Sequence, residues 1–360
     1  MKIIIDKDFI LAPVSKLVNI TEKRSLMPIL SNILIEFSRD KTIVYSTDLE
    51  VSAISYLDYK TDTEKKIVIH GRKFLDILKE LDSGEISLEI KENTLTIRQK
   101  QTEIVLSLQD PEEFPEIKEI TGQEEFYLDG RTLLEMINKV GFGVSVDETR
   151  YVLTGMHMRG TGGKVIVVGT DGFRMALYQK EIKGLKGFKG ITIPKRSITE
   201  VERVIDNEDE VKLTIDEKRV QFSTKKVTII SRVIEGNFPD YENVVPVNNN
   251  IATIFKEAFI KGLKKVSVII GRSEPIKIKL IEGAMEIEAE SDMGHAREVV
   301  EVEYHGEEIS MNFNVRFVMD VVTHIDGESV VMKVPLIYGA VVFEGKEGEY
   351  YKNIVMPIKV

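Results

Sequence analysis

The sequence of 360 residues repeats itself, and this repeat limits the possible folds more than any other feature. A short strand-like run, then a turn residue, then an amphipathic helical segment occurs six times. The predicted strands close about sixty residues apart, at Asp6, His70, Asp129, Pro194, Thr253 and Asn314. The helical windows that follow are 9–24, 72–81, 131–144, 195–205, 255–267 and 314–325. Solenoid repeats are shorter, so each unit has room for one helix and several strands.

A longer period lies over the short one. Three pairs each end a predicted strand about 120 residues apart: Thr47-Asp48, Thr170-Asp171 and Ser291-Asp292. Phe114-Pro115 recurs as Phe238-Pro239. The segments between the helices alternate apolar and polar residues, which predicts antiparallel sheets with one buried face. We therefore predict an α+β fold of three repeated domains, each with antiparallel sheets and two helices, at 1–121, 122–246 and 247–360.

The distribution of charge matters more than its sum. The formal net charge is −10, yet the six helical windows hold 16 Lys and Arg against 8 Asp and Glu. If all six helices faced one way, the protein would present a positive face on an acidic body, and such a face attracts phosphates without reading base sequence. Alternatively, each helix has an ordinary solvated face of Lys and Arg. Charge alone leaves both interpretations open.

Composition excludes several classes of protein. The chain has no cysteine, which excludes disulfides and thiolate metal sites. No apolar run is long enough to span a membrane, and the N-terminal MKIIIDKDFI has acidic residues where a secretory signal would have its apolar core. With 42% hydrophobic and 30% charged residues, we expect a cytoplasmic globular protein.

No catalytic motif stands out. The histidines show no metal-ligand spacing: His70, His157, His295, His305 and His324. Segment 160–164 lacks the full phosphate-loop pattern and predicts a hairpin turn. The repeated Thr/Ser-Asp pairs favour a turn or capping role, because Asp bonds nearby backbone amides. We interpret the chain as non-enzymatic, with no metal or cofactor.

One enzymatic alternative is a metal-dependent nucleic-acid enzyme. Its carboxylate site would use Asp48, Asp171 and Asp292. Those residues fall in three different repeats, and one ion would have to gather all three.

Six segments stand in a recognisable order: RSLMPILSN (24–32), STDLE (46–50), TDGFRMA (170–176), NFPDY (237–241), FNVRF (313–317) and MPIKV (356–360). In these segments, and along its whole length, the chain resembles the beta sliding clamp family of bacterial DNA polymerase III. The resemblance implies a processivity factor for DNA replication, without catalytic activity of its own. It implies a head-to-tail homodimer that closes into a ring around duplex DNA, without sequence specificity and with the helices facing the DNA.

The resemblance also assigns residues. DNA contacts fall on Arg24, Arg72, Asp147, Tyr151 and Val152, with Asp147 standing where a neutral polar residue contacts DNA in the family. The dimer interface joins Ile104 and Leu106, on a strand expected at a sheet edge, to Val268 and Ile269 of a second copy.

A pocket for a short apolar peptide is implied as well. Its partners are the polymerase catalytic subunit, the clamp loader and other replication and repair proteins. An apolar groove with one arginine suits such a peptide. The family positions fall on Leu153, Thr170, Gly172, Phe173, Arg174, Met175, Pro239, Asn243, Val244, Ile354, Val355, Met356, Pro357, Ile358, Lys359 and Val360. Phe173 stands where some members carry histidine.

Overall fold

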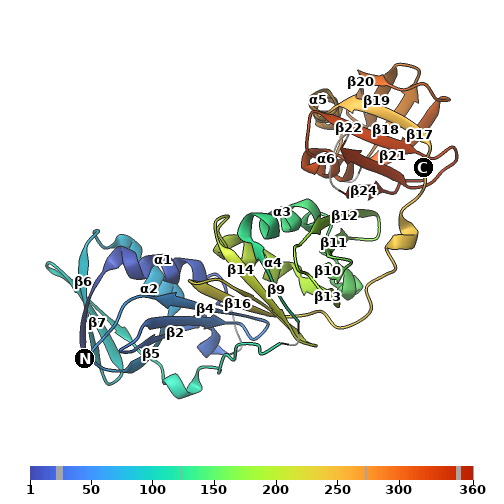
Figure 1. Ribbon diagram of the computed structural model, residues 1–360. Coiled ribbons are helices and arrows are strands. Elements are labelled where there is room, and N and C mark those ends of the chain that lie inside the picture. The colour runs from blue at the N-terminus through green and yellow to red at the C-terminus, as the bar shows by residue number, and fades with distance from the viewer. Residues whose placement is uncertain (22–26, 123, 272–273, 346–349, 360) are drawn as a thin grey trace. The chain divides into compact units, whose positions relative to one another are not determined.

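The computed structural model describes residues 1–21, 27–122, 124–271, 274–345 and 350–359. Two compact units make up the described chain (Figure 1). The first unit contains Met1–Leu134 and Arg196–Val233, and the second contains Glu135–Lys195 and Ile234–Val360. The central repeat therefore contributes strands to both units, because its strands pair with those of either neighbour.

The first unit contains β1 (Lys2–Asp6), α1 (Lys7–Leu17), η1 (Pro28–Ser31), β2 (Asn32–Phe37), β3 (Thr42–Thr47), β4 (Val51–Leu57), β5 (Lys65–His70), α2 (Gly71–Glu80), β6 (Glu85–Lys91), β7 (Thr94–Gln99), β8 (Thr102–Ser107), η2 (Pro111–Glu113), β9 (Glu124–Asp129), most of α4 (Lys195–Val204), β14 (Glu210–Ile215), β15 (Arg219–Ser223) and β16 (Val227–Arg232). Its described strands form the sheets β5-β2-β3-β4-β16-β15-β14-β9 and β1-β6-β7-β8.

The second unit contains most of α3 (Gly130–Gly141), then η3 (Glu148–Leu153), β10 (Gly155–Thr161), β11 (Lys164–Thr170), β12 (Arg174–Glu181), β13 (Phe188–Pro194), η4 (Glu242–Val244), β17 (Asn250–Phe255), α5 (Lys256–Val266), η5 (Ser267–Ile269), β18 (Pro275–Ile281), β19 (Ala284–Ser291), β20 (Gly294–Glu303), β21 (Ile309–Asn314), α6 (Val315–His324), β22 (Ser329–Val334), β23 (Val341–Gly345) and β24 (Tyr351–Val355). Its described strands form one sheet, β13-β10-β11-β12-β24-β23-β22-β17-β20-β19-β18-β21.

Each repeat has the same order: a strand, a helix, four strands, a second helix and three further strands. Four of the described helices, α1, α2, α3 and α6, begin where a strand ends in a capping side chain. Asp6 accepts from the amide of Asp8 at 2.8 Å, and Asp129 accepts from that of Thr132 at 2.7 Å, which satisfies amides that the first turn leaves unpaired. The expected α+β fold with antiparallel sheets is confirmed.

Two details differ from the sequence-based expectation. The strand expected to close at Thr253 runs on to Phe255, because Phe255 still pairs with Ser329 of β22. The first helix begins at Lys7, because Asp6 caps it before the expected start, and it ends at Leu17, before the expected end at residue 24. Segment 160–164 forms the predicted hairpin: Thr161 pairs with Lys164, and Gly162 and Gly163 both have positive φ, as a tight two-residue turn requires.

Amphipathic helices cover the sheets and supply much of the core. In α2, Phe74, Leu75 and Leu78 are buried, and in α5, Phe259 and Leu263 are buried. Burying a side chain of this kind contributes about 1.5–3 kcal/mol. The same helices leave lysines exposed on their other side, at Lys73 and Lys79 of α2 and at Lys261 and Lys264 of α5.

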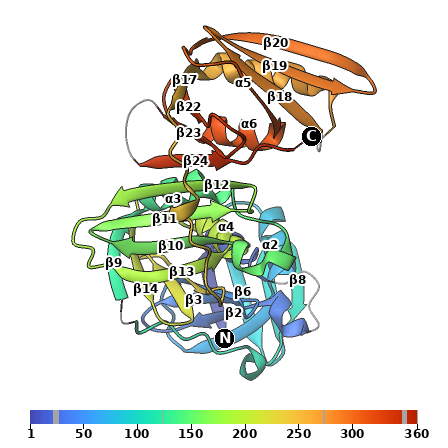
Figure 2. The same cartoon turned by 90° about the vertical axis from the view of Figure 1, so that its right-hand side faces the viewer.

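Two strand pairs join consecutive repeats. At the first junction, β4 of the first repeat pairs with β16, the last strand of the second, with Val51 opposite Ser231. At the second junction, β12 of the second repeat pairs with β24, the last strand of the third, with Arg174 opposite Val355 (Figure 2). Each junction lies within one compact unit. No helix of the described residues is both long and apolar enough to cross a membrane.

Candidate functional site

A groove of about 150 Å³ opens at the second junction. It is lined by Leu153, Thr170, Gly172, Phe173, Arg174, Met175, Phe238, Pro239, Tyr241, Val244, Ile354 and Met356. All of these except Phe238 and Tyr241 belong to the predicted peptide pocket. The lining is mostly apolar or aromatic, so the groove suits an apolar ligand.

The turn before β12 shapes one wall of the groove. The hydroxyl of Thr170 donates to the carbonyl of Arg174 at 2.6 Å and accepts from the amide of Gly172 at 3.1 Å. Asp171 Oδ1 accepts from the amides of Phe173 and Arg174, at 2.9 and 3.0 Å. Gly172 has a φ of 86°, and a Cβ there would lie 2.4 Å from a guanidinium nitrogen of Arg150. The tight turn leaves the Phe173 ring exposed at the rim.

Arg174 lines the groove, but its charge is directed inward. Its Nε lies 3.1 Å from Asp171 Oδ2, and one Nη lies 2.5 Å from a carboxylate oxygen of Asp320 in α6. The other Nη donates to the carbonyl of Phe142 at 2.8 Å. The guanidinium also lies over the Phe317 ring, 4.5 Å from its centroid. Arg174 therefore ties β12 to α6 and supports the groove.

The C-terminal segment forms the opposite wall. The amide of Met356 donates to the carbonyl of Phe173 at 2.9 Å, which continues the pairing of β24 beyond its end. The amide of Ile358 then donates to the carbonyl of Asn312 at 2.7 Å. Met356 is thus held beside Phe173, with 38% of its side chain exposed.

Other predicted pocket residues lie outside this lining. Val355 is fully buried, and the side-chain amide of Asn243 donates to Asp240 at 2.7 Å. The carbonyl of Pro357 accepts from the Tyr338 hydroxyl, and the amino group of Lys359 lies over the Tyr338 ring. Ile358 contacts β21 through its backbone. Val360 falls outside the described residues.

Sequence reasoning missed the aromatic floor of the groove. Phe238 stacks on His157, with ring centroids 4.5 Å apart, and Tyr241 packs beside both. Burial lowers the pKa of His157 to about 4, and the positive charge of Arg159 adds to the effect. The recurrence of Phe-Pro at 114 and 238 was the available signal, since it marks the segment that crosses each junction.

The residues predicted to contact DNA differ in exposure and in hydrogen bonding. Arg72 is exposed in the first turn of α2, 3.4 Å from Asp76. Asp147 caps η3, where it accepts from the amide and hydroxyl of Thr149, and these bonds lower the pKa of its carboxyl. Tyr151 is exposed and Val152 half-buried in η3. Arg24 falls outside the described residues.

The predicted dimer residues lie at exposed edges. Ile104 and Leu106 are half-buried on β8, the last strand of its sheet as the described residues define it. Val268 and Ile269 follow α5 in η5, and Val268 is 78% exposed. The structure describes each pair within a single chain.

The described residues show no carboxylate cluster of the kind that the enzymatic alternative requires. Within the described ranges, no group of three or more His, Cys, Asp or Glu side chains is arranged to hold a metal ion. Asp48 Oδ1 accepts from the amides of Glu50 and Val51, as Asp171 does in its own turn. The predicted turn role is confirmed for both residues.

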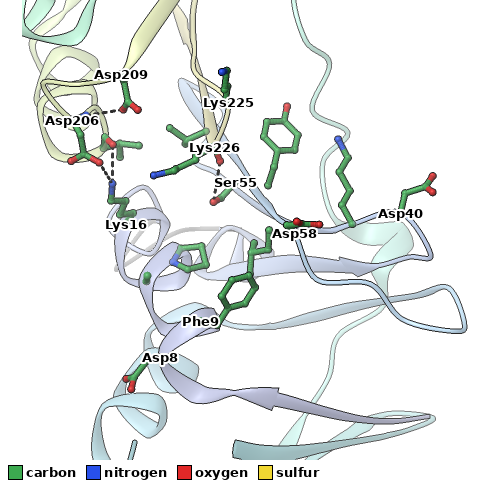
Figure 3. A pocket seen from close by; sticks show the side chains of 17 residues that line it. Asp8, Phe9, Lys16, Asp40, Ser55, Asp58, Asp206, Asp209, Lys225 and Lys226 are labelled. Carbon is green, nitrogen blue, oxygen red and sulfur yellow. Dashed lines mark hydrogen bonds and ion pairs between the residues drawn. The ribbon is translucent and has the colours of Figure 1, made fainter. Parts of the chain in front are cut away.

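A cavity of about 930 Å³ lies at the first junction (Figure 3). Residues of α1 form one side of it, and the ends of β4 and β16 form another. Lys16 points from α1 to Asp206, beyond the end of α4, as the dashed lines show (Figure 3). The remaining lining carries both signs of charge, such as Asp58 and Lys226, so it favours no ligand of either sign.

The repeat and the apolar groove together define a protein of three similar repeats with an apolar groove where the second and third repeats join. Comparison with known families agrees. The DNA polymerase III beta subunit models match this chain in order: the N-terminal domain over residues 1–118, the central domain over 127–240 and the C-terminal domain over 242–359.

Curated relatives and solved structures point the same way. The beta sliding clamp of Caulobacter vibrioides is 30% identical, covering 91% of each chain, and that of Haemophilus influenzae is 26% identical over the full length of both. Among solved structures, the sliding clamp of Caulobacter crescentus has a TM-score of 0.94 at 27% identity over all of both chains. The beta subunit of Thermotoga maritima has a TM-score of 0.93 at 27% identity, covering 100% of this chain and 99% of that one.

This chain belongs to the family of the bacterial DNA polymerase III beta subunit, the beta sliding clamps. Its function is that of a processivity clamp in DNA replication, which acts with DNA and a DNA polymerase. The alternative of a metal-dependent enzyme has no such support.

Proposed function

We propose that two copies of this chain close head to tail into a ring around duplex DNA. The ring carries no catalytic activity and works in the cytoplasm. It tethers the polymerase catalytic subunit, the clamp loader and repair proteins through an apolar peptide in the groove at the second junction. The three repeats divide near residues 121 and 246. The observation that carries the proposal is that two strands, β8 and β20, lack the partner strand that their counterparts have at the two junctions.

Both junctions follow one rule: the last strand of a repeat pairs with the fourth strand of the repeat before it. By this rule β8, the last strand of the first repeat, needs the fourth strand of another repeat. β20, the fourth strand of the third repeat, needs a last strand. In the described residues β8 is a sheet edge, and β20 meets β17 only at Val302 and Glu303. A second copy supplies what each edge needs, and head-to-tail contacts of this kind close rings.

The register of this pairing follows from the two junctions. Ala53 lies opposite Ile229 at the first junction, and Ala176 lies opposite Asn353 at the second. These four residues hold equivalent positions when each strand is counted from its hairpin. The same counting gives one register for β8 against β20.

In that register Ile104 lies opposite Ala296 of the partner subunit, and Glu103 lies opposite Arg297. The first pair is half-buried and apolar, and the second pair carries opposite charges, which suits directly opposed residues. Val268 and Ile269 follow the helix that packs under β20, so they would cover the same contact.

DNA binding would rest on the exposed cations of the helices. Arg72 is exposed, as are Lys261, Lys264 and Lys265 of α5, and Arg24, Tyr151, Val152 and the loop at Asp147 complete the proposed surface. Contacts with phosphates alone are weak, salt-dependent and blind to sequence. Those properties suit a ring that must slide.

The experiment that tests the ring compares circular and linear DNA. Protein loaded on closed circular DNA should survive high salt, because release requires opening the subunit interface, and linearising the DNA should release it. Val268→Asp with Ile269→Asp should sediment as a folded monomer and should not be retained on the circle. Equal loss from intact circles and linear DNA at moderate salt would reject the ring.

A further inference from the structure

Each repeat carries a lysine at the same place in its first helix. Lys16, Lys139 and Lys265 are each the tenth residue of α1, α3 and α5. Two of these lysines reach the end of a helix in the following repeat, and the third has no following repeat within its chain.

The two intrachain contacts are alike. Lys16 Nζ lies 3.1 Å from the carbonyl oxygen of Val204 and 3.2 Å from Asp206 (Figure 3). Val204 is the last residue of α4, and Asp206 lies two residues beyond it. Each lysine of this kind satisfies a carbonyl that the helix end leaves unpaired, and it places a cation at the negative end of the helix dipole.

The second contact repeats the first with a more buried lysine. Lys139 Nζ lies 2.7 Å from the carbonyl oxygen of His324, the last residue of α6, and 2.6 Å from Asp326. Its side chain is only 6% exposed. Tyr351 donates its hydroxyl to the carbonyl of Lys139 itself and so fixes this part of the helix.

The third lysine, Lys265, pairs with a carboxylate of its own repeat. Lys265 Nζ lies 2.6 Å from Glu298 of β20, and about half of the lysine is exposed. In the first repeat the second helix is α2, which ends at Glu80, and Asp82 lies two residues beyond. Asp82 contacts Lys100 at 2.7 Å, and both side chains are well exposed. The end of α2 therefore has the same carboxylate as α4 and α6, without the lysine of a preceding repeat.

We propose that Lys265 caps α2 of a second copy of this chain, with its Nζ between the Glu80 carbonyl oxygen and the Asp82 carboxylate of the partner subunit. The inference rests on the proposed head-to-tail ring and specifies a contact within it. On assembly Lys265 leaves Glu298, and Asp82 leaves Lys100. The subunit contact then has the same cap as the two junctions within the chain.

The residues left behind can pair with each other. The register derived above places Glu298 opposite Thr102 of the partner subunit, and Lys100 stands two residues before Thr102. The freed carboxylate and the freed ammonium group therefore lie at the same end of the strand pair. No charge loses its partner, because the two ion pairs within each chain are exchanged for one cap and one new ion pair in an interface, where screening by water is weaker.

Complementary charge reversals test this contact. Lys265→Asp and Asp82→Lys should each raise the dimer dissociation constant about tenfold or more, measured by sedimentation, because each homodimer then holds two repulsive contacts. An equimolar mixture of the two variants should recover the wild-type dissociation constant to within a few-fold. The mixed dimer has one native contact and one reversed contact, and both are attractive. Circular dichroism would verify that each variant is folded.

Matched variants distinguish the cap from a role of Lys265 within its own subunit. Lys264→Asp changes the exposed neighbour of Lys265 and should leave the dissociation constant unchanged. Its mixed dimer with Asp82→Lys has one native and one repulsive contact, so it should stay weaker than the mixed dimer of Lys265→Asp with Asp82→Lys. Glu298→Gln should leave the dissociation constant unchanged to within a few-fold, because that carboxylate pairs with Lys265 in the single chain and with Lys100 of the partner subunit in the dimer. A rise after Glu298→Gln equal to that after Lys265→Met would assign the lysine to its own subunit and overturn the proposal.

The ring and the cap can fail separately. If the wild-type chain is a dimer that Val268→Asp with Ile269→Asp disrupts, but the charge-reversed mixture does not recover, the cap is wrong and the ring stands. If the wild-type chain sediments as a monomer at micromolar concentration, the ring itself is wrong.

Discussion

The first and second junctions have the same backbone frame and different side chains. In each, a threonine hydroxyl and an aspartate carboxylate hold the turn before the joining strand. The amide of Arg232 then donates to the carbonyl of Glu50 at 3.0 Å, as that of Met356 donates to Phe173 at 2.9 Å. The strand pairing is therefore independent of what the junction presents to solvent.

What differs is the rim. At the first junction Glu50 and Arg232 stand side by side as an exposed ion pair at 3.7 Å, where the second junction has the apolar Phe173 and Met356. Leu49 occupies the position of Gly172, with a φ of 76°. Below the rim, Ile117 and Ile120 pack on the first junction, whereas Phe238 and Tyr241 pack on the second. A few side chains thus decide which junction offers an apolar groove.

Exchanging the rim should have the largest effect. Phe173→Glu with Met356→Arg gives the second junction the ion pair of the first, and should weaken binding of an apolar clamp-binding peptide about a hundredfold or more, measured by fluorescence anisotropy, because hot-spot contacts are lost and polar groups replace them. Met356→Ala alone should cost about 1–2 kcal/mol, and deleting residues 356–360 should abolish binding without affecting the dimer. Glu50→Gln with Arg232→Gln is the matched control and should leave affinity unchanged. Equal loss in both pairs would move the peptide site elsewhere.

The arginine that stabilises each junction provides a second test. Arg174→Met should lower the free energy of unfolding by about 3 kcal/mol, because the variant strands Asp171 and Asp320 in partly buried positions. Arg196 pairs with Asp48 at 2.5 Å at the first junction, but half of its side chain is exposed. Arg196→Met strands one carboxylate, that of the almost fully buried Asp48, whereas Arg174→Met strands two, so it should cost less, about 2 kcal/mol. Denaturant titration measures both, and a larger loss from Arg196→Met would reverse this ranking of the junctions.

Acid should weaken the second junction selectively through His157. Its folded pKa of about 4 lies below that of an exposed histidine, so the unfolded chain binds the proton first as pH falls. The stabilisation is complete above about pH 6.5 and is lost on descent toward pH 4, about 2 kcal/mol between pH 7 and 4.5. His157→Leu should remove this part of the pH dependence, because leucine cannot titrate. Leu34 holds the position of His157 at the first junction, so Leu34→His is the matched reverse change, which adds a titratable group there. A parallel pH profile in wild type and His157→Leu would contradict the assignment.

The repeat predicted the fold because strand and helix periods are local properties of the sequence. Alternation and capping residues such as Asp6 and Asp129 locate the elements without knowledge of what they pack against. The end of β17 was missed at Thr253, because cross-strand pairing with β22 decides it. The charge excess in the helical windows could not show which way the helices face.

The groove was predicted through resemblance, and its physical details were not. The sequence marks Arg174 as a pocket residue, but not that Asp320, 146 residues away, takes up its charge. His157 was interpreted as an ordinary histidine, because its stacking on Phe238 depends on contacts distant in the chain. The contacts of Lys16 and Lys139 with the ends of α4 and α6 likewise depend on residues distant in the chain, so the sequence does not predict them.

The smallest expected effect concerns the backbone turn that the junctions share. Leu49 has a φ of 76°, a region that costs a residue with a side chain about 1 kcal/mol, whereas the equivalent Gly172 adopts it freely. Leu49→Gly should therefore raise the free energy of unfolding, by about 0.5 kcal/mol, since the greater freedom of glycine in the unfolded chain offsets part of the gain. Glu50 neighbours Leu49 but lies outside the left-handed region. Glu50→Gly therefore has the entropic cost of glycine with no relief of backbone strain, and it should destabilise the protein. Denaturant titration of both variants separates the relief of backbone strain from the entropic cost of glycine in the unfolded chain. If Leu49→Gly destabilises as much as Glu50→Gly does, the leucine is unstrained, and the glycine at 172 is there to leave room for Arg150 alone.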